Sequence, residues 1–255
     1  MIRLTFLLRR RSDLTLAEFQ DYWLNEHGPL VTGFADAFNT LRYVQVHTLE
    51  SNANQRLADA RGGSMELPYD GVAELWWRNE AELDASTRTA AGRQAGAALI
   101  ADEANFLDPI NSSVYLGYEY PQINPAQPVI ATPDSGLTKV YFPLRSTLDD
   151  DVAQAYWHQS HGPLIRSLAA TSGLAKYMQV HRSEHPLAQV FRNSRGIISK
   201  PYLGHAEVWI RNTRVDADAA RAAAARAVVD ERQFIDFEQS AIWLAHEHVL
   251  VDREL

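Results

Sequence analysis

The stretch YWLNEHGPL at residues 22–30 decides the fold, because it returns as YWHQSHGPL at residues 156–164. Tyr, Trp, His, Gly, Pro and Leu keep their places at a constant offset of 134 positions. A Trp and a His that hold their spacing over this distance indicate an internal repeat, which is the first feature to seek in a new sequence. The chain therefore carries one structural unit twice.

Two further blocks extend the repeat. The pattern Tyr-x-Gln-Val-His at 43–47 recurs at 177–181, and PYDGVAELWWRN at 68–79 recurs as PYLGHAEVWIRN at 201–212. Between the copies, PQINPAQPVIATPDSG contains four prolines, a composition typical of an extended linker. We therefore predict one module at residues 1–120, a linker at 121–136 and a second module at 137–255.

Each copy shows the same succession of strands and helices. In the first copy, residues 2–9, 41–47 and 71–78 are predicted strands, because they are apolar or alternate with a period of two. Thr15 and Glu18 form a capping-box pattern before the helix that ends at His-Gly-Pro. With a second helix and a last strand, the order is β-α-β-β-α-β, which is ferredoxin-like. We predict an α+β fold of two ferredoxin-like modules packed sheet to sheet into one barrel.

The two middle strands of each copy indicate where a cavity would lie. Tyr43, Gln45 and His47 share one face of their strand, and Glu74 and Trp76 share one face of the next. The opposite faces are apolar. We expect helices to cover the apolar faces, and the polar and aromatic faces of both copies to enclose a shared semi-polar cavity inside the barrel.

Composition excludes several classes of protein. The 255 residues carry a formal net charge of −8, which argues against nucleic-acid and anionic-membrane partners. There is no cysteine, so disulfides, thiolate catalysis and Cys-ligated zinc are excluded. No apolar run could span a bilayer, and the N-terminus lacks the charge order of a signal peptide, so we expect a cytoplasmic protein. Nucleotide-binding and serine-hydrolase motifs are also missing.

The repeated motifs Tyr-Trp-x-x-x-His-Gly-Pro-Leu and Tyr-x-Gln-x-His resemble the EthD-domain family of dimeric α+β barrel proteins. The resemblance covers nearly the whole chain, once in each half, and implies a pseudo-dimer fused in one chain. Further association of copies stays open. It also implies a role in the breakdown of small organic compounds or in aromatic-polyketide processing. Related barrels include cofactor-free enzymes and haem enzymes, so the fold alone does not fix the reaction.

Histidine dominates the candidate site, because it titrates near neutral pH and passes protons in either direction. Seven of the nine histidines lie in the second half, which favours that half for chemistry. The candidate catalytic residues are His27, His47, His161, Tyr177, His181, His205 and Glu207, and the candidate substrate-binding residues are Tyr22, Trp23, Tyr43, Tyr156, Trp157, Arg195 and Trp209.

Structural interpretations of the same residues stay open. His27 and His161 could cap a helix end, and each Tyr-x-Gln-x-His segment could form hydrogen bonds within the barrel. Glu74 could pair with Arg78, and Glu207 with Arg211, because each arginine is the second residue after the glutamate on the same strand face.

Metal binding is not expected. His158 with His161 and His246 with His248 offer two ligands each, and neither pair has an evident third ligand in the sequence.

Three functions follow from these observations. The leading hypothesis is an enzyme without cofactor that acts on a small apolar or aromatic compound by proton transfer, as a dehydratase, decarboxylase, cyclase or isomerase. His161 and His181 would be its acid and base, and Tyr177 or Tyr156 would orient an oxygen. The alternatives are a small-molecule-binding protein without catalysis, and a haem protein with His181 or His205 as the axial ligand.

Overall fold

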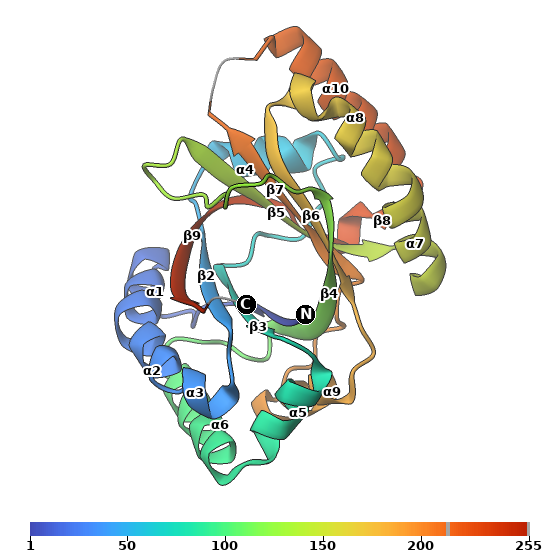
Figure 1. Cartoon of the computed structure of the whole chain (residues 1–255). Coiled ribbons are helices and arrows are strands. Elements are labelled where there is room, and N and C mark those ends of the chain that lie inside the picture. Colours follow the sequence, from blue (N-terminus) through green and yellow to red (C-terminus); the bar gives the residue numbers. More distant parts are fainter. Residues whose placement is uncertain (213–214, 254–255) are drawn as a thin grey trace.

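The computed structural model describes residues 1–212 and 215–253 (Figure 1). Residues 213, 214, 254 and 255 of the predicted second module lie outside this description. The chain forms a closed barrel in which all neighbouring strands are antiparallel. Its strands, in chain order, are β1 (Ile2–Leu8), β2 (Arg42–Thr48), β3 (Gly71–Trp77), β4 (Ser113–Ile123), β5 (Leu137–Ser146), β6 (Leu174–Arg182), β7 (Gly204–Arg211) and β9 (Trp243–Asp252).

Each half of the chain contributes four neighbouring strands in the same order. The first half supplies β4-β1-β3-β2, and the second supplies β9-β5-β7-β6, which is the fourth, first, third and second strand in each case. Two seams, β2–β9 and β4–β6, join the halves by hydrogen bonding and close the barrel. The short β8 (Ile235–Asp236) pairs with the end of β5. The predicted α+β barrel is therefore confirmed, and β4 runs to Ile123, into the predicted linker.

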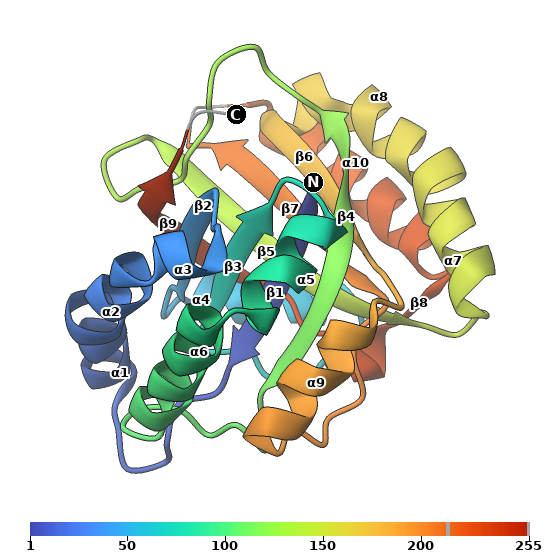
Figure 2. The same cartoon turned by 60° about the horizontal axis from the view of Figure 1, so that its bottom comes forward.

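Helices lie on the outside of the barrel, and most helices of one half lie on the side opposite to those of the other (Figure 1, Figure 2). The exceptions are the helix Asn52–Asp59, which lies against β9 of the second half, and the helix Pro186–Arg195, which lies against β4 of the first half. None of the helices, within the described ranges, combines the length and hydropathy that crossing a membrane requires. The helices are α1 (Leu16–Tyr22), α2 (Gly28–Gly33), α3 (Ala35–Phe38), α4 (Asn52–Asp59), α5 (Glu80–Arg88), α6 (Ala90–Glu103), α7 (Asp150–Tyr156), α8 (Gly162–Ser172), α9 (Pro186–Arg195) and α10 (Ala217–Glu231), with a 3₁₀ turn η3 (Phe237–Gln239).

The repeated helix motif forms a π-helical turn in both halves. The capping box at Thr15 and Glu18 starts α1 as predicted, and the turn η1 (Trp23–His27) follows it directly. In the second half, η2 (Trp157–His161) follows α7 in the same way. Each histidine is thus the last residue of a wide turn, immediately before the Gly-Pro that opens α2 or α8.

The predicted strand faces are correct for β3 and β7 but wrong for β2 and β6. In the sheet, Val44 pairs with Glu74 and Tyr43 pairs with Leu75, and directly paired residues point to the same side. Leu75 packs in the core beneath the helices, so Tyr43 and its neighbours of the same parity lie there as well. The second half repeats this register with Met178 opposite Glu207.

Hydrogen bonding explains why a polar strand face lies beneath helices. The side-chain amide of Gln45 donates to the backbone oxygen of Trp23 at 2.7 Å and to the hydroxyl of Tyr43 at 2.8 Å. The Nε2 atom of His47 lies 2.9 Å from the Gln45 amide oxygen, and the Trp23 ring stacks on the His47 ring at 4.7 Å. The polar residues therefore fasten the strand to the π-helical turn and leave few buried groups unpaired.

Equivalent hydrogen bonds connect the strand to the π-helical turn in the second half. Gln179 donates to the backbone oxygen of Trp157 at 2.9 Å, and Nε2 of His181 lies 3.2 Å from the Gln179 amide oxygen. Trp157 stacks on His181 at 4.6 Å. The sequence motif Tyr-x-Gln-x-His is thus a repeated structural connection between strand and helix.

Candidate functional site

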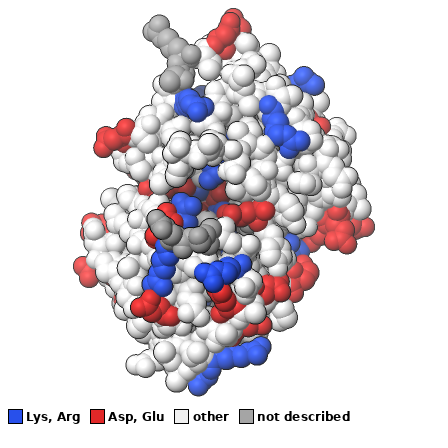
Figure 3. Space-filling model, in the orientation of Figure 1, with Lys and Arg blue, Asp and Glu red and all other residues white. Residues whose placement is uncertain are grey.

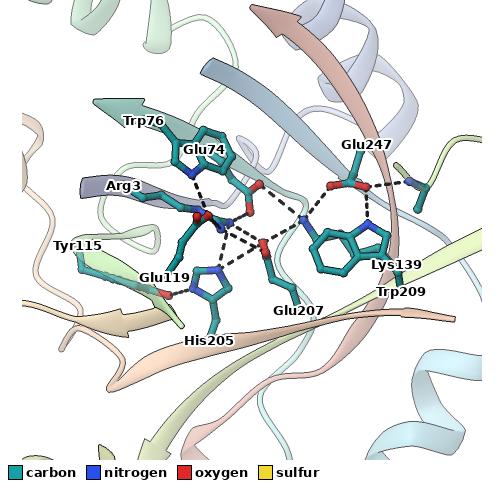
Figure 4. Close-up of polar contacts among 11 residues, drawn as sticks. Arg3, Glu74, Trp76, Tyr115, Glu119, Lys139, His205, Glu207, Trp209 and Glu247 are labelled. Carbon is teal, nitrogen blue, oxygen red and sulfur yellow. Dashed lines mark hydrogen bonds and ion pairs between the residues drawn. The ribbon is translucent and has the colours of Figure 1, made fainter. Parts of the chain in front are cut away.

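The interior of the barrel is filled by a network of buried charges (Figure 4). The guanidinium of Arg3 pairs with Glu74 and Glu207, and the ammonium of Lys139 lies 2.9 Å from Glu207. Burial alone would raise the pKa of Glu207, but Arg3 and Lys139 outweigh it and hold that pKa well below its usual range. Burial raises the pKa of Glu74. The expected pairing of these carboxylates with Arg78 and Arg211 is wrong, because those arginines lie outside the barrel, where Arg78 pairs with Glu82.

Two further carboxylates extend this network symmetrically. Glu119 lies 3.1 Å from the guanidinium of Arg3 and accepts a hydrogen bond from the indole of Trp76 at 2.8 Å. Glu247 lies 3.1 Å from the ammonium of Lys139 and accepts from the indole of Trp209 at 2.6 Å. The space that remains beside this network is a hollow of about 120 Å³, around which charged side chains gather (Figure 3). The inward faces of β3 and β7 therefore hold a packed network, with little room for a substrate.

His205 belongs to this interior network. It is completely buried, its Nδ1 lies 2.6 Å from the Tyr115 hydroxyl, and its Nε2 lies 3.2 Å from Arg3. Burial lowers its pKa to about 3, so its ring is neutral at physiological pH. With Glu74 and Glu207 it forms a three-ligand group of the kind that can hold a metal ion. The Arg3 guanidinium contacts all three residues, however, and occupies the place of a cation.

Neither histidine that was expected as a haem ligand fits that role. Both nitrogens of His205 are engaged within the network just described. Nε2 of His181 is engaged by Gln179, and its ring lies between Trp157 and Tyr120, whose ring centre is 4.5 Å away. Burial lowers the pKa of His181, and equally that of His47, to about 3. Both histidines lie beneath the helices, away from the cavities that could hold a ligand.

The space that a small molecule needs lies outside the barrel, between each half of the sheet and the helices that cover it. In the second half, a cavity of about 730 Å³ is lined mainly by apolar side chains. In the first half, a corresponding cavity measures about 410 Å³. Both volumes fall within the range of small-molecule sites. We call them the larger and the smaller cavity. Phe142, Trp157, Tyr177, Val208 and Ile210 line the larger, and Phe6, Val31, Tyr43, Leu75 and Trp77 line the smaller.

A histidine held by a carboxylate stands at the wall of the larger cavity. The Nδ1 atom of His161 lies 2.7 Å from one oxygen of Asp230, and the Tyr156 hydroxyl donates to the other oxygen at 2.9 Å. The hydrogen bond from His161 lowers the pKa of Asp230, so this group is ionised. Because a carboxylate accepts only, Nδ1 carries the proton, and the unprotonated nitrogen of the neutral ring is Nε2.

The smaller cavity has the same arrangement. Nδ1 of His27 lies 2.7 Å from Asp102, whose other oxygen accepts from the Tyr22 hydroxyl at 2.8 Å. Tyr22 and Tyr156, expected to bind substrate, are therefore used to hold an aspartate. Asp102 and Asp230 were not among the predicted site residues, although the pattern Asp-Glu-x-x-Phe repeats at 102–106 and 230–234.

An arginine from the opposite half completes each cavity. Arg61, which follows α4, makes two hydrogen bonds of 2.8 Å to Glu231 in the larger cavity. Arg195, at the end of α9, makes two hydrogen bonds of 2.7 Å to Glu103 in the smaller cavity. Arg195 thus serves the first half, although it lies in the second half of the chain. Each cavity therefore needs both halves, and its arginine is neutralised by a carboxylate.

The structure divides these candidate residues among four places. His161, Tyr177 and Trp157 line the larger cavity, and His27, Tyr43 and Arg195 line the smaller. A further group is in the interior of the barrel or beneath the helices, with no access to either cavity: His205, Glu207 and Trp209 in the interior, and Trp23, His47 and His181 beneath the helices.

Fold and cavities together define a single-chain α+β barrel with one helix–sheet cavity in each half. A model of the EthD domain matches residues 11–110 and 145–238. The chain therefore belongs to the EthD domain family, as the repeated motifs predicted. Comparison with curated proteins gave no match.

Solved structures resemble the whole chain. An anthrone oxidase-like protein has a TM-score of 0.54 at 10% identity, over 100% of this chain and 96% of its own. A provisionally named chlorite dismutase has a TM-score of 0.49 at 13% identity, over 97% and 94% of the two chains. A provisionally named monooxygenase from Lactobacillus acidophilus NCFM has a TM-score of 0.47 at 9% identity, over 100% and 97%. At these identities the likeness concerns the fold alone.

Proposed function

We propose that the protein is an enzyme without cofactor that acts on a small cyclic or aromatic compound by proton transfer in the larger cavity. One observation supports this most directly: a histidine, oriented by an ionised aspartate, stands at the wall of a mainly apolar cavity of about 730 Å³. A dry pocket with few, well-placed polar groups is typical of small-molecule sites. The reaction would be a dehydration, decarboxylation, cyclisation or isomerisation.

The proposed base is Nε2 of His161. It takes a proton from a carbon next to a substrate carbonyl, and Asp230 stabilises the imidazolium that forms. The proton then returns to a leaving hydroxyl, which departs as water, or to another carbon. His181, expected to share this work, takes no part in the scheme because it lies outside the cavity.

Tyr177 is the proposed partner of the substrate oxygen. Its oxygen accepts hydrogen bonds from Gln179 at 3.0 Å and from the Trp157 indole at 3.1 Å. Within the described residues its own hydroxyl hydrogen has no acceptor, and the side chain lines the cavity. A hydroxyl that already accepts two hydrogen bonds is well placed to donate its own to the oxygen on which charge develops.

We also propose that the halves are two ferredoxin-like modules, at residues 1–120 and 137–255, separated by a linker at 121–136. The common strand order of the halves supports this division.

The substrate of the proposed enzyme is neutral, since the carboxylate of an anionic substrate would have to compete with Glu231 for Arg61.

Proton transfer can be tested before the natural substrate is known. Anthrone is a three-ring ketone with an acidic CH₂ group, and its hydrogen exchange in D₂O under anaerobic conditions can be followed by NMR. We expect the protein to accelerate this exchange, and His161→Ala to reduce the acceleration by about 10²- to 10⁴-fold. His246→Ala is the matched control, because this histidine is on the outer face of β9 and lines neither cavity.

Each result of this experiment has a clear meaning. Equal exchange by His161→Ala and the native protein, both with native melting temperatures, would contradict the assigned base. Tight anthrone binding without accelerated exchange would favour the alternative function, a binding protein without catalysis.

A further inference from the structure

We propose that the smaller cavity is a second ligand site, and that the two sites accept neutral aromatic molecules of different size. The inference rests on the proposed use of the helix–sheet cavities and extends it to the first half. A cavity of about 150 Å³ holds one benzene ring. On that scale, 410 Å³ accommodates about two to three fused rings and 730 Å³ about four to five.

Four side-chain exchanges at repeat-equivalent positions contribute to the difference in volume. In each of these four the bulkier residue lines the smaller cavity, whereas the smaller exchanges Val31 for Ile165 and Gly96 for Ala224 run in the opposite direction. The strand residue Trp77 corresponds to Ile210 at the offset of 133, and Phe191 corresponds to Leu57 at the offset of 134. Phe38 corresponds to Ser172 at the offset of 134. Leu99 corresponds to Ala227 at the offset of 128, which is also the offset between Asp102 and Asp230.

The polar groups of the smaller cavity are retained in full. His27 is held by Asp102, and Arg195 is paired with Glu103, with distances that match those of the larger cavity within 0.1 Å. Tyr43 lines the wall where Tyr177 lines the other. A hollow that served packing alone would need none of these groups. The smaller cavity therefore has the same polar residues as the larger cavity but a smaller volume.

Charge defines the chemical class of ligand. The less exposed arginine of each cavity, Arg61 or Arg195, already makes two hydrogen bonds to a buried glutamate. The other arginines that line the cavities, Arg93, Arg221 and Arg232, are exposed to solvent, which weakens their attraction for an anion. The remaining walls are mostly apolar. Phenols and ketones of fused-ring systems match such a cavity, because they bury apolar area and present one neutral oxygen.

The test uses two neutral fluorescent phenols, 2-naphthol with two rings and 1-hydroxypyrene with four, in equilibrium dialysis at pH 7. For the native chain we expect about two molecules of 2-naphthol and about one of 1-hydroxypyrene per chain. Trp77→Ile should raise 1-hydroxypyrene to about two per chain. Ile210→Trp should abolish 1-hydroxypyrene binding and leave 2-naphthol unchanged.

A second variant protects the test against a folding artefact. The Trp77 indole donates to the backbone oxygen of Phe38 at 2.6 Å, and Trp77→Ile removes this bond. Leu99→Ala enlarges the same cavity and leaves the hydrogen bond between Trp77 and Phe38 in place. This variant should also bind more 1-hydroxypyrene than the native chain.

The inference is overturned if native protein binds one 2-naphthol per chain, or two 1-hydroxypyrene, or if neither enlarged variant gains binding. The proposed function is judged separately by the His161-dependent exchange. Exchange without a second 2-naphthol site would leave the function standing and refute the inference. The expected stoichiometries without exchange would leave two binding sites and refute catalysis.

Discussion

The barrel interior and the helix–sheet cavities differ in how they combine polarity with space. The interior contains two cations and four carboxylates but leaves a hollow of only about 120 Å³. The two cavities are mainly apolar, contain one histidine–aspartate pair and one arginine–glutamate pair each, and measure about 730 and 410 Å³. Polar residues on a strand therefore do not by themselves mark a site. In the interior the charges neutralise one another and fill the space, whereas the proposed ligand sites combine apolar walls with one histidine oriented by an aspartate.

The largest expected effect concerns the interior. Arg3→Met leaves Glu74 and Glu207 without their main cation in a buried setting, which should destabilise the fold by about 3–5 kcal/mol. Urea denaturation of the variant measures this loss. Arg3→Lys retains a positive charge, so its free energy of unfolding should decrease less than that of Arg3→Met. A destabilisation below about 1 kcal/mol for Arg3→Met would contradict the view that the interior is a structural network.

The next test concerns the strand face beneath the helices. Gln179→Leu removes the hydrogen bond to the Trp157 backbone oxygen and leaves a buried carbonyl unpaired, at an expected loss of about 1–3 kcal/mol. Gln45→Leu should behave alike in the first half. Anthrone exchange per folded molecule should stay near the native rate in Gln45→Leu. It should decrease modestly in Gln179→Leu, because the Tyr177 hydroxyl then accepts one hydrogen bond instead of two. A loss of exchange in Gln45→Leu, or a complete loss in Gln179→Leu, with native stability would return these residues to the active site.

Acid should weaken the barrel interior through His205. His47 and His181, whose pKa values burial also lowers to about 3, should add a similar loss beneath the helices. The pKa of His205 is about 3 in the folded protein and about 6.5 when unfolded, so the unfolded state takes up the proton first as the pH falls. Stability from this group is complete above pH 6.5 and decreases toward pH 3. At pH 5 the loss is about 2 kcal/mol relative to pH 7. His205→Gln should reduce the measured pH dependence by about that amount, whereas His246→Gln should leave most of it. An unchanged dependence in His205→Gln would show that another group is responsible.

The smallest expected effect concerns the charge balance of the larger cavity. Glu231→Gln removes the carboxylate that neutralises Arg61 and should raise the affinity for 2-naphthoate about tenfold, which is about 1.4 kcal/mol. The affinity for neutral 2-naphthol should change little. Calorimetric titration with both compounds measures the difference. If 2-naphthoate gains no affinity, Arg61 does not face the ligand.

Much of the architecture could be predicted because the repeat is long and includes rare residues. The repeated blocks that include Trp23 and Trp157 predict two equivalent halves, and alternation along β3 correctly places Glu74 inside the barrel. The capping box at Thr15 was predicted from local pattern, because the interaction spans only three residues. These features depend on short-range order or on exact repetition, and both are visible in one sequence.

The failures share a different physical origin. Alternation separates two faces of a strand but does not reveal which polar groups can be satisfied by a distant backbone oxygen, as Gln45 is by Trp23. The crossing of Arg61 and Arg195 into opposite halves depends on where two long connections run in space. Asp102 and Asp230 could have been found, because they repeat together with the histidines that they hold.

The two seams, β2–β9 and β4–β6, have a consequence for how such a protein can diversify. In an assembly of separate identical chains, an exchange such as Trp for Ile in the cavity wall would alter every copy of the pocket at once. In this protein both halves belong to one polypeptide, so the two different halves pair at high effective concentration. The sequence therefore does not have to disfavour pairing between two identical halves. One gene can thus pass on two pockets together while mutation reshapes each of them on its own.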